Sequence, residues 1–138
     1  MKIPLLNQLK KRIHIDLAAL QDEVAEIVYE LEPTAVLHGG TAIWRCYGGN
    51  RFSEDLDFYS KSERLVHELE AKVISHHLVL TKFKKTDNVI FSKISNGTVD
   101  VRLEISLRLP NKKIAAEYVR LDGTFMSVLT ISPEDLIM

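Results

Sequence analysis

The residues with the clearest capacity for chemistry are two aspartates, Asp55 and Asp57, in the stretch "EDLDFYS". Polar and apolar residues alternate there. This predicts a strand that points both carboxylates to one face and Leu56 and Phe58 to the core. Neighbouring carboxylates repel each other unless a positive charge lies between them. Because Mg²⁺ prefers one or two carboxylates together with phosphate oxygens, the pair predicts a metal site. The alternative is two solvated strand residues.

A glycine pair lies upstream of the aspartates. Gly39 and Gly40 separate a short apolar run, "TAVLH", from the stretch "TAIWRCY", which indicates a short helix. Glycine lets the backbone approach a ligand closely, and the free N–H groups of a helix N-terminus can bind phosphate. Thr41 adds a hydroxyl donor. Followed by two aspartates, this arrangement predicts a site for a metal-bound nucleoside triphosphate, whereas a glycine pair alone is more often a turn.

Helical periodicity dominates the first part of the chain. Apolar residues recur every three or four positions from Pro4 to Leu31, which predicts one long helix that Pro33 ends. The next predicted elements are a buried strand at 34–38, a short helix at 41–47, the aspartate strand at 55–60 and a helix at 62–75.

Beyond that helix the period changes from helical to two, which predicts strands. The strand candidates are 77–85, 88–95, 98–109, 116–121 and 124–132. "SPEDLIM" then opens like a helix, with Ser132 as its N-cap. Helices early and antiparallel strands late indicate an α+β domain.

The stretch "HGGTAIWRCYGGNRFSEDLDF" resembles the signature of the nucleotidyltransferase superfamily, in which a strand, a glycine pair and a helix precede Asp-x-Asp. More closely, it is similar to the AbiEii/AbiGii-type nucleotidyltransferases, toxins of type IV toxin–antitoxin and phage abortive-infection systems. The matching positions are Gly39, Gly40, Thr41, Ala42, Arg51, Ser53, Asp55 and Asp57. The resemblance implies a nucleotidyltransferase-like mixed or antiparallel sheet with helices packed on one face.

The same resemblance implies a function. A metal-dependent enzyme of this kind moves a nucleoside monophosphate from a nucleoside triphosphate to a hydroxyl acceptor, here the 3′ end of tRNA or a protein hydroxyl. Mg²⁺ or Mn²⁺ is the expected cofactor, and a cognate antitoxin is a further expected partner. The alternatives are a catalytically incomplete nucleotide- or RNA-binding module of the same fold and, more remotely, a structural interaction domain.

The resemblance also assigns catalytic and metal-binding roles. Asp55 and Asp57 would hold the metal together with a third acid on a neighbouring antiparallel strand. Glu104 in "VRLEIS" is the best-placed third acid, and Asp100 shares its strand face. An acid on the outer face of a half-buried strand is equally well explained as a solvated residue.

The phosphate side of the expected site consists of Gly39, Gly40, Thr41, Arg51 and Ser53. Arg51 has the charge and bidentate geometry to contact a triphosphate, or it forms a salt bridge within the loop. Ser53 either binds a phosphate or caps a turn.

The end of the sequence departs from the resembling toxins. Their segment similar to "ISPEDLIM" opens a helix that carries a lysine, and a later Arg-Asp segment adds another acid. Both would follow Met138. We therefore expect residues 1–138 to form a single domain that lacks a C-terminal helical part, with turnover impaired. The alternative is a compact member of the family that completes its site in a different way.

Composition limits the domain size, the cellular compartment and the kind of nucleic-acid contact that fit this sequence. A chain of 138 residues is long enough for one packed core, and its single cysteine allows no internal disulfide, which favours the cytoplasm. No apolar run approaches the length of a membrane span. With a net charge of −1, any contact to nucleic acid must be local. Lys82, Lys84 and Lys85 are candidates for it, or simply an exposed strand face.

Overall fold

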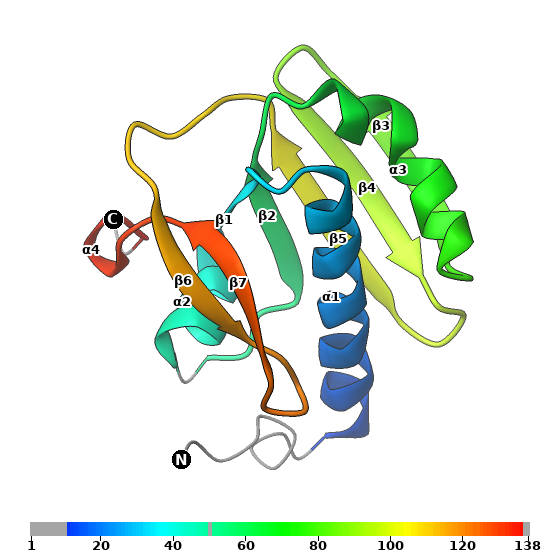
Figure 1. The fold of residues 1–138 in the computed structure, drawn as a ribbon. Helices are drawn as coiled ribbons and strands as arrows, with labels where there is room; N and C mark the ends of the chain where they lie inside the picture. The colour runs from blue at the N-terminus through cyan, green and yellow to red at the C-terminus, as the bar shows by residue number, and fades with distance from the viewer. Residues whose placement is uncertain (1–10, 50, 137–138) are drawn as a thin grey trace.

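The computed structural model describes residues 11–49 and 51–136. The helices are α1 (Arg12–Leu31), α2 (Gly39–Tyr47), α3 (Glu63–Ser75) and α4 (Pro133–Leu136). The strands are β1 (Val36–His38), β2 (Asp55–Tyr59), β3 (Val79–Lys85), β4 (Val89–Ser95), β5 (Asp100–Ser106), β6 (Ile114–Val119) and β7 (Phe125–Thr130). The predicted α+β class with a long first helix is confirmed (Figure 1).

The strands form one seven-stranded mixed sheet of order β3-β4-β5-β2-β1-β7-β6. β1 pairs antiparallel with β2 and parallel with β7, and β2 pairs parallel with β5. On one side, β3, β4 and β5 form an antiparallel meander; on the other, β6 and β7 form a hairpin. The two central strands, β1 and β2, therefore receive their outer neighbours from later parts of the chain.

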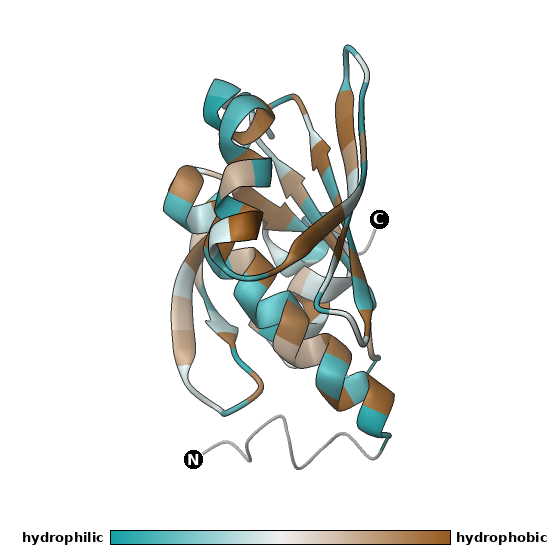
Figure 2. Cartoon of the chain, turned by 90° about the vertical axis from the view of Figure 1, so that its right-hand side faces the viewer, coloured by the Kyte–Doolittle hydropathy of each residue, from teal (hydrophilic) through white to brown (hydrophobic). Residues whose placement is uncertain are grey.

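One face of the central sheet is covered by α1 and α3. Leu56 and Phe58 of β2 and Leu103 of β5 lie in a single core cluster with the apolar stripe of α1 and with Leu65 of α3. Figure 2 shows hydrophobic residues recurring between hydrophilic ones along α1, the periodicity that predicted this helix. Burial of these apolar side chains contributes roughly 25 cal/mol per Å² to folding, so this layer fixes the position of β2.

The opposite face of the same strands carries polar side chains, arranged in two rows that cross the sheet. The first row is Lys82, Lys93, Arg102 and Asp55; the second is Lys84, Phe91, Glu104, Asp57 and His38. Residues paired across strands project to the same face. The sheet thus presents the predicted acids beside a group of cations.

Several local features refine the sequence predictions. α2 begins at Gly39, two positions earlier than predicted, and ends at Gly48, whose φ of 69° is typical of a helix-terminating glycine. Ser132 caps α4, since its Oγ accepts from Asp135 N at 3.3 Å. The part of the predicted first helix within residues 1–10, and the last two residues of "SPEDLIM", lie outside the described residues. Among the described helices, none is both long and apolar enough to span a bilayer.

The expectation that the third acid would lie on a strand antiparallel to the aspartate strand is wrong. β5 runs parallel to β2 and is antiparallel only to β4. A parallel neighbour requires a long crossover, and α3 with the β3–β4 hairpin supplies one. The direction of β5 thus differs from the expectation, but its outward face still lies beside that of β2.

Candidate active site

The predicted acids lie on adjacent strands. Asp57 of β2 and Glu104 of β5 are direct cross-strand partners, and Asp55 precedes Asp57 on the same face. All three carboxylates line one open hollow of about 520 Å³. Asp100, the alternative third acid, lines a different hollow beside the start of α1. The structure therefore brings Glu104, rather than Asp100, to the aspartate pair.

The environment of Asp57 disfavours an isolated negative charge. Loss of solvation raises the pKa of Asp57 to about 7, and the neighbouring carboxylates of Glu104 and Asp55 and a hydrogen bond with Glu104 add to the rise. A carboxyl that is crowded in this way becomes a stable anion when a cation lies beside it. A metal-binding carboxylate has such a raised pKa as long as no cation lies beside it.

Asp55 has a cationic partner within the protein. Nε of Arg102 lies 3.0 Å from Oδ1 of Asp55. The same oxygen has no aligned hydrogen-bond donor in the described part of the chain, so the contact is an ion pair without good hydrogen-bond geometry. The side chain of Arg102 is 65% exposed and that of Asp55 is 46% exposed, and an ion pair with this exposure contributes little to stability. Arg102 is therefore free to exchange Asp55 for another partner.

The acidic residues suit a hard divalent cation. Carboxylate oxygens are the ligands that Mg²⁺ prefers, and Mg²⁺ takes few protein ligands and completes its shell with water and substrate phosphates. In residues 11–49 and 51–136, no three His, Cys, Asp or Glu side chains already surround a common metal position. Asp57 and Glu104 face each other while Asp55 turns to Arg102. Convergence of all three acids on one ion stays a prediction.

The glycine pair lies against the acidic strand. Gly39 has a φ of +77°, and a Cβ there would lie 2.5 Å from Oδ2 of Asp57. A side chain at this position would collide with the carboxylate and strain the backbone. A Cβ on Gly40 would lie 3.1 Å from Oγ of Ser53, which is a tight but less severe contact. Gly39 therefore makes room for Asp57, and Gly40 keeps the approach to Ser53 open.

Thr41 joins the first turn of α2 to the start of β2. Its side chain is buried, its hydroxyl donates to the carbonyl of Asp55, and its oxygen lies 3.0 Å from Oγ of Ser53. The hydroxyl is thus engaged within the protein in this structure. The predicted contact of Thr41 with phosphate stays untested.

A second open hollow, of about 470 Å³, adjoins the acidic one. The predicted phosphate residues Gly40, Arg51 and Ser53 line it together with Asp55 and Arg102. Gly39 and Thr41 are not part of its lining. Arginine and a helix N-terminus both favour anions, whereas the carboxylates of Glu54 and Asp55 also line this hollow, so phosphate binding here stays a prediction. The two hollows share Asp55 and Arg102, which stand at their common border.

His38, which directly precedes the glycine pair, also lies next to the site. It is the cross-strand partner of Asp57, and its ring stacks on that of Tyr59 with centroids 3.8 Å apart. Burial lowers the pKa of His38 to about 4, so the imidazole is neutral near pH 7. Its Nε2 is buried and has no hydrogen-bond partner in the described part of the chain.

A buried polar network behind the site was also missed by sequence reasoning. Arg45 of α2 is 1% exposed and pairs with Asp22 of α1 at 2.7 Å. A cation within an otherwise apolar helix such as "TAIWRCY" was the available signal. This signal alone does not show whether Arg45 is buried against a partner or exposed to solvent, because the partner lies on another helix.

Comparison with known proteins agrees with this geometry. Residues 25–138 match the sequence model of a family described as "Nucleotidyl transferase AbiEii toxin, Type IV TA system". No protein with a curated description matches the sequence.

Two solved structures share the fold. The crystal structure of JHP933 from Helicobacter pylori has a TM-score of 0.57 and 25% identity, covering 87% of this chain and 54% of that one. A Helicobacter pylori protein described as a proposed nucleotidyltransferase has a TM-score of 0.63 and 24% identity, covering 94% of this chain and 57% of that one. The present chain thus spans a little over half the length of each.

Proposed function

Because the chain belongs to the AbiEii family of nucleotidyltransferase toxins, we propose that it is a metal-dependent nucleotidyltransferase of a type IV toxin–antitoxin system. It moves a nucleoside monophosphate from a nucleoside triphosphate to a hydroxyl acceptor. A cognate antitoxin and a cytoplasmic setting belong to the same proposal.

The observation that carries this proposal is the pair of adjoining hollows that meet at Asp55. One is lined by Gly40, Arg51 and Ser53, which are groups that bind phosphate, and the other by three carboxylates. A triphosphate in the first hollow extends its α-phosphate to the border, where the carboxylates begin. An acceptor in the second hollow reaches the same phosphorus from the other side.

The residues divide the reaction between them. The acceptor oxygen forms a bond to the α-phosphorus, the bond from that phosphorus to the α–β bridging oxygen breaks, and pyrophosphate leaves. Asp55, Asp57 and Glu104 would hold Mg²⁺ (or Mn²⁺), and the bound ion supplies charge neutralisation for the attacking and leaving oxygens. Glu104 would ligate the metal or, alternatively, take the proton of the acceptor hydroxyl. Arg51 and Ser53 hold the phosphates that leave.

The surroundings of the acids favour a phosphate-bearing acceptor, such as the 3′ end of tRNA, over a protein hydroxyl. Lys82, Lys84 and Lys93 line the acidic hollow, and Phe91, which is 42% exposed, lies beside Glu104. Lysines attract the backbone of a nucleic acid, and an exposed ring is a surface on which a base can stack. Lys85, the third predicted RNA contact, does not line this hollow.

A labelling experiment tests the proposal. The 138-residue chain is incubated with Mg²⁺, each of the four labelled nucleoside triphosphates, and either total tRNA or total protein. Because turnover of residues 1–138 alone is expected to be impaired, we expect weak label in the tRNA fraction, and this label should disappear with EDTA or with Asp57→Asn. Metal-dependent nucleotide binding without any labelled product would instead favour the alternative function, a binding module without turnover. No nucleotide binding at all would contradict both.

A further inference from the structure

The loop that carries Ser53 is held from behind by a buried side chain of α1. Nε2 of Gln21 donates to the carbonyl oxygen of Ser53 at 2.7 Å. Gln21 is fully buried, with 0% of its surface exposed, so its two polar ends must both find partners inside the protein. The contact joins residues 32 positions apart and fixes the chain just before β2 begins.

The other end of the same amide is held by Arg45. Nη2 of Arg45 donates to Oε1 of Gln21 at 3.0 Å and to the carbonyl of Ala18 at 3.1 Å. An arginine can only donate and a backbone carbonyl can only accept. The Gln21 amide therefore has one permitted orientation, with its oxygen toward Arg45 and its NH₂ toward Ser53. Because the amide of Gln21 accepts from Arg45 and donates to Ser53, it connects Arg45 to the loop in a fixed geometry.

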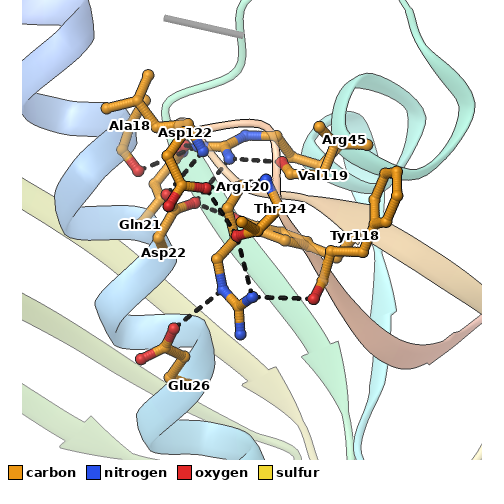
Figure 3. A network of polar contacts seen from close by, with 12 residues as sticks. Ala18, Gln21, Asp22, Glu26, Arg45, Tyr118, Val119, Arg120, Asp122 and Thr124 are labelled. Carbon is orange, nitrogen blue, oxygen red and sulfur yellow. Dashed lines mark hydrogen bonds and ion pairs between the residues drawn. The ribbon is translucent and has the colours of Figure 1, made fainter. Parts of the chain in front are cut away.

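Arg45 is in turn immobilised by groups from two elements, α1 and β6 (Figure 3). Nη1 of Arg45 donates to Asp22 at 2.7 Å and to the carbonyl of Val119 at 3.0 Å. The guanidinium also lies over the ring of Tyr118, 5.0 Å from its centroid. Asp22 accepts from the Leu121 N–H at 2.9 Å and so fixes the end of β6. The buried guanidinium is thus a rigid reference point for Gln21.

The loop anchored in this way contributes groups to the phosphate hollow. Ser53 lines that hollow, and its Oγ lies 3.0 Å from Thr41 and close to the backbone of Gly40. Catalytic and binding groups lose effect when they shift by about 1 Å, at a cost of roughly a hundredfold in the extreme case. Arg51 and Glu54 of this loop are exposed, and within residues 11–49 and 51–136 the contact from Gln21 is the one side-chain hydrogen bond to the backbone of residues 51–54.

We propose that Gln21 is a positioning residue for phosphate binding, coupling the buried Arg45 to the Ser53 loop. The inference rests on the proposed function, because it concerns the same nucleotide site. Gln21 touches neither phosphate nor metal. It acts by holding Ser53 where its hydroxyl faces the phosphates.

The discriminating variant is Gln21→Glu. The carboxylate keeps the size of glutamine and accepts from Arg45, but it cannot donate to the Ser53 carbonyl and repels it. The matched control is Tyr29→Phe on the same helix, which removes the hydrogen bond from the Tyr29 hydroxyl to the Leu129 carbonyl at 3.2 Å and touches neither Arg45 nor the Ser53 loop. Both proteins are first checked for folding by circular dichroism, and all measurements are made well below their Tm.

Two readouts are taken from the full chain. Calorimetry measures the Kd for each of the four nucleoside triphosphates with Mg²⁺, and hydrogen exchange follows the amides of residues 51–54. We expect Gln21→Glu to weaken nucleotide binding roughly tenfold and to speed exchange in the loop. Tyr29→Phe should lower Tm while leaving the Kd within about twofold. In a Ser53→Ala background the effect of Gln21→Glu on Kd should shrink, because the positioned hydroxyl is gone.

The possible failures point to different conclusions. If the wild-type chain binds no nucleoside triphosphate with Mg²⁺, the proposed function is wrong. If the wild type binds and Gln21→Glu binds equally well with unchanged loop exchange, the positioning role is wrong while the proposed function stands. If Gln21→Glu and Tyr29→Phe weaken binding equally, Gln21 only supports the fold and the inference is overturned. If Gln21→Glu does not fold, Gln21→Met takes its place, because methionine also lacks the donor to Ser53.

Discussion

Asp57 and Glu104 stand directly opposite each other on two parallel strands, and burial with mutual repulsion raises the pKa of Asp57 to about 7. Two carboxyls in this relationship can share a proton or share a cation. The neighbouring hollow is lined by groups that bind phosphate. For the proposed reaction, the state that matters is therefore the one in which Asp57 and Glu104 share a cation.

Glu104→Gln should reduce nucleotidyl transfer by roughly a hundredfold or more, the usual loss when a catalytic acid or base is removed. Glutamine fills the same space but can neither ligate Mg²⁺ as an anion nor take a proton. Asp100→Asn is the control, since Asp100 lies on the same strand and lines a different hollow. Transfer rates of both variants are compared with wild type. An equal loss of transfer rate in the two variants would contradict the choice of Glu104, rather than Asp100, as the third acid.

The two glycines should respond differently to substitution. Gly39→Ala should destabilise the fold by about 1–2 kcal/mol from its left-handed backbone alone, with an added cost from the contact with Asp57. Gly40→Val should leave the fold largely intact and weaken nucleotide binding more than tenfold, because the side chain fills the approach to Ser53. Chemical denaturation and calorimetry measure the two effects. Unchanged nucleotide affinity in folded Gly40→Val would show that the glycines form only a turn.

Arg102→Gln should strengthen binding of Mg²⁺ in the absence of nucleotide. The arginine pairs with Asp55 and competes with a metal for the same carboxylate. An exposed ion pair contributes about 0.2–1 kcal/mol, so the expected gain in affinity is roughly two- to fivefold. Lys93→Gln removes a neighbouring cation of the same row and is the control for a general charge effect. A gain of the same size in both variants would contradict direct competition.

His38 should contribute to loss of stability in mild acid. Burial depresses its pKa in the folded protein from 6.5 to about 4, so between these values the unfolded chain binds a proton that the folded protein does not. The free energy of unfolding should therefore fall as pH drops from about 6.5 to 4. His38→Phe keeps a ring to stack on Tyr59 and should remove roughly 1–2 kcal/mol of this dependence, less than the full shift implies because the ring is partly solvated. Denaturation at pH 7 and pH 4.5 measures it, and an unaltered pH dependence in the variant would exclude His38 as its source.

The parts of the fold that follow from local patterns were predictable. The three- and four-residue spacing of apolar side chains predicted α1, and alternation predicted β2 and β5, because those periods reflect one buried face. The direction of β5 was not predictable in this way. Alternation fixes which residues share a face but says nothing about which strand becomes the neighbour or whether the two run parallel.

The same limit applies to the site. Gly39, Asp55 and Asp57 were predicted because they lie close together in a recognisable order, and Glu104 because it lies on a strand of the right pattern. Gln21 could not be found, since its role depends on a contact with Ser53 across 32 positions. Its position four residues after Leu17 and three before Val24 places it on the apolar face of α1, but helical spacing does not identify its partner.

The strand order has a consequence for how the protein is made. β1 obtains its second neighbour, β7, only near the end of the described chain, where Val36 pairs with Leu129 and the Thr130 hydroxyl donates to the Leu37 carbonyl at 2.7 Å. Pairings between such distant segments form slowly, because a long loop must close before any contact compensates for it. During translation, the strand that leads into Gly39 therefore lacks one of its supports until residue 130 has left the ribosome. A nascent chain shorter than this should hold β1 less firmly beside β2, so we expect the proposed nucleotide site to become ordered only after β7 has paired.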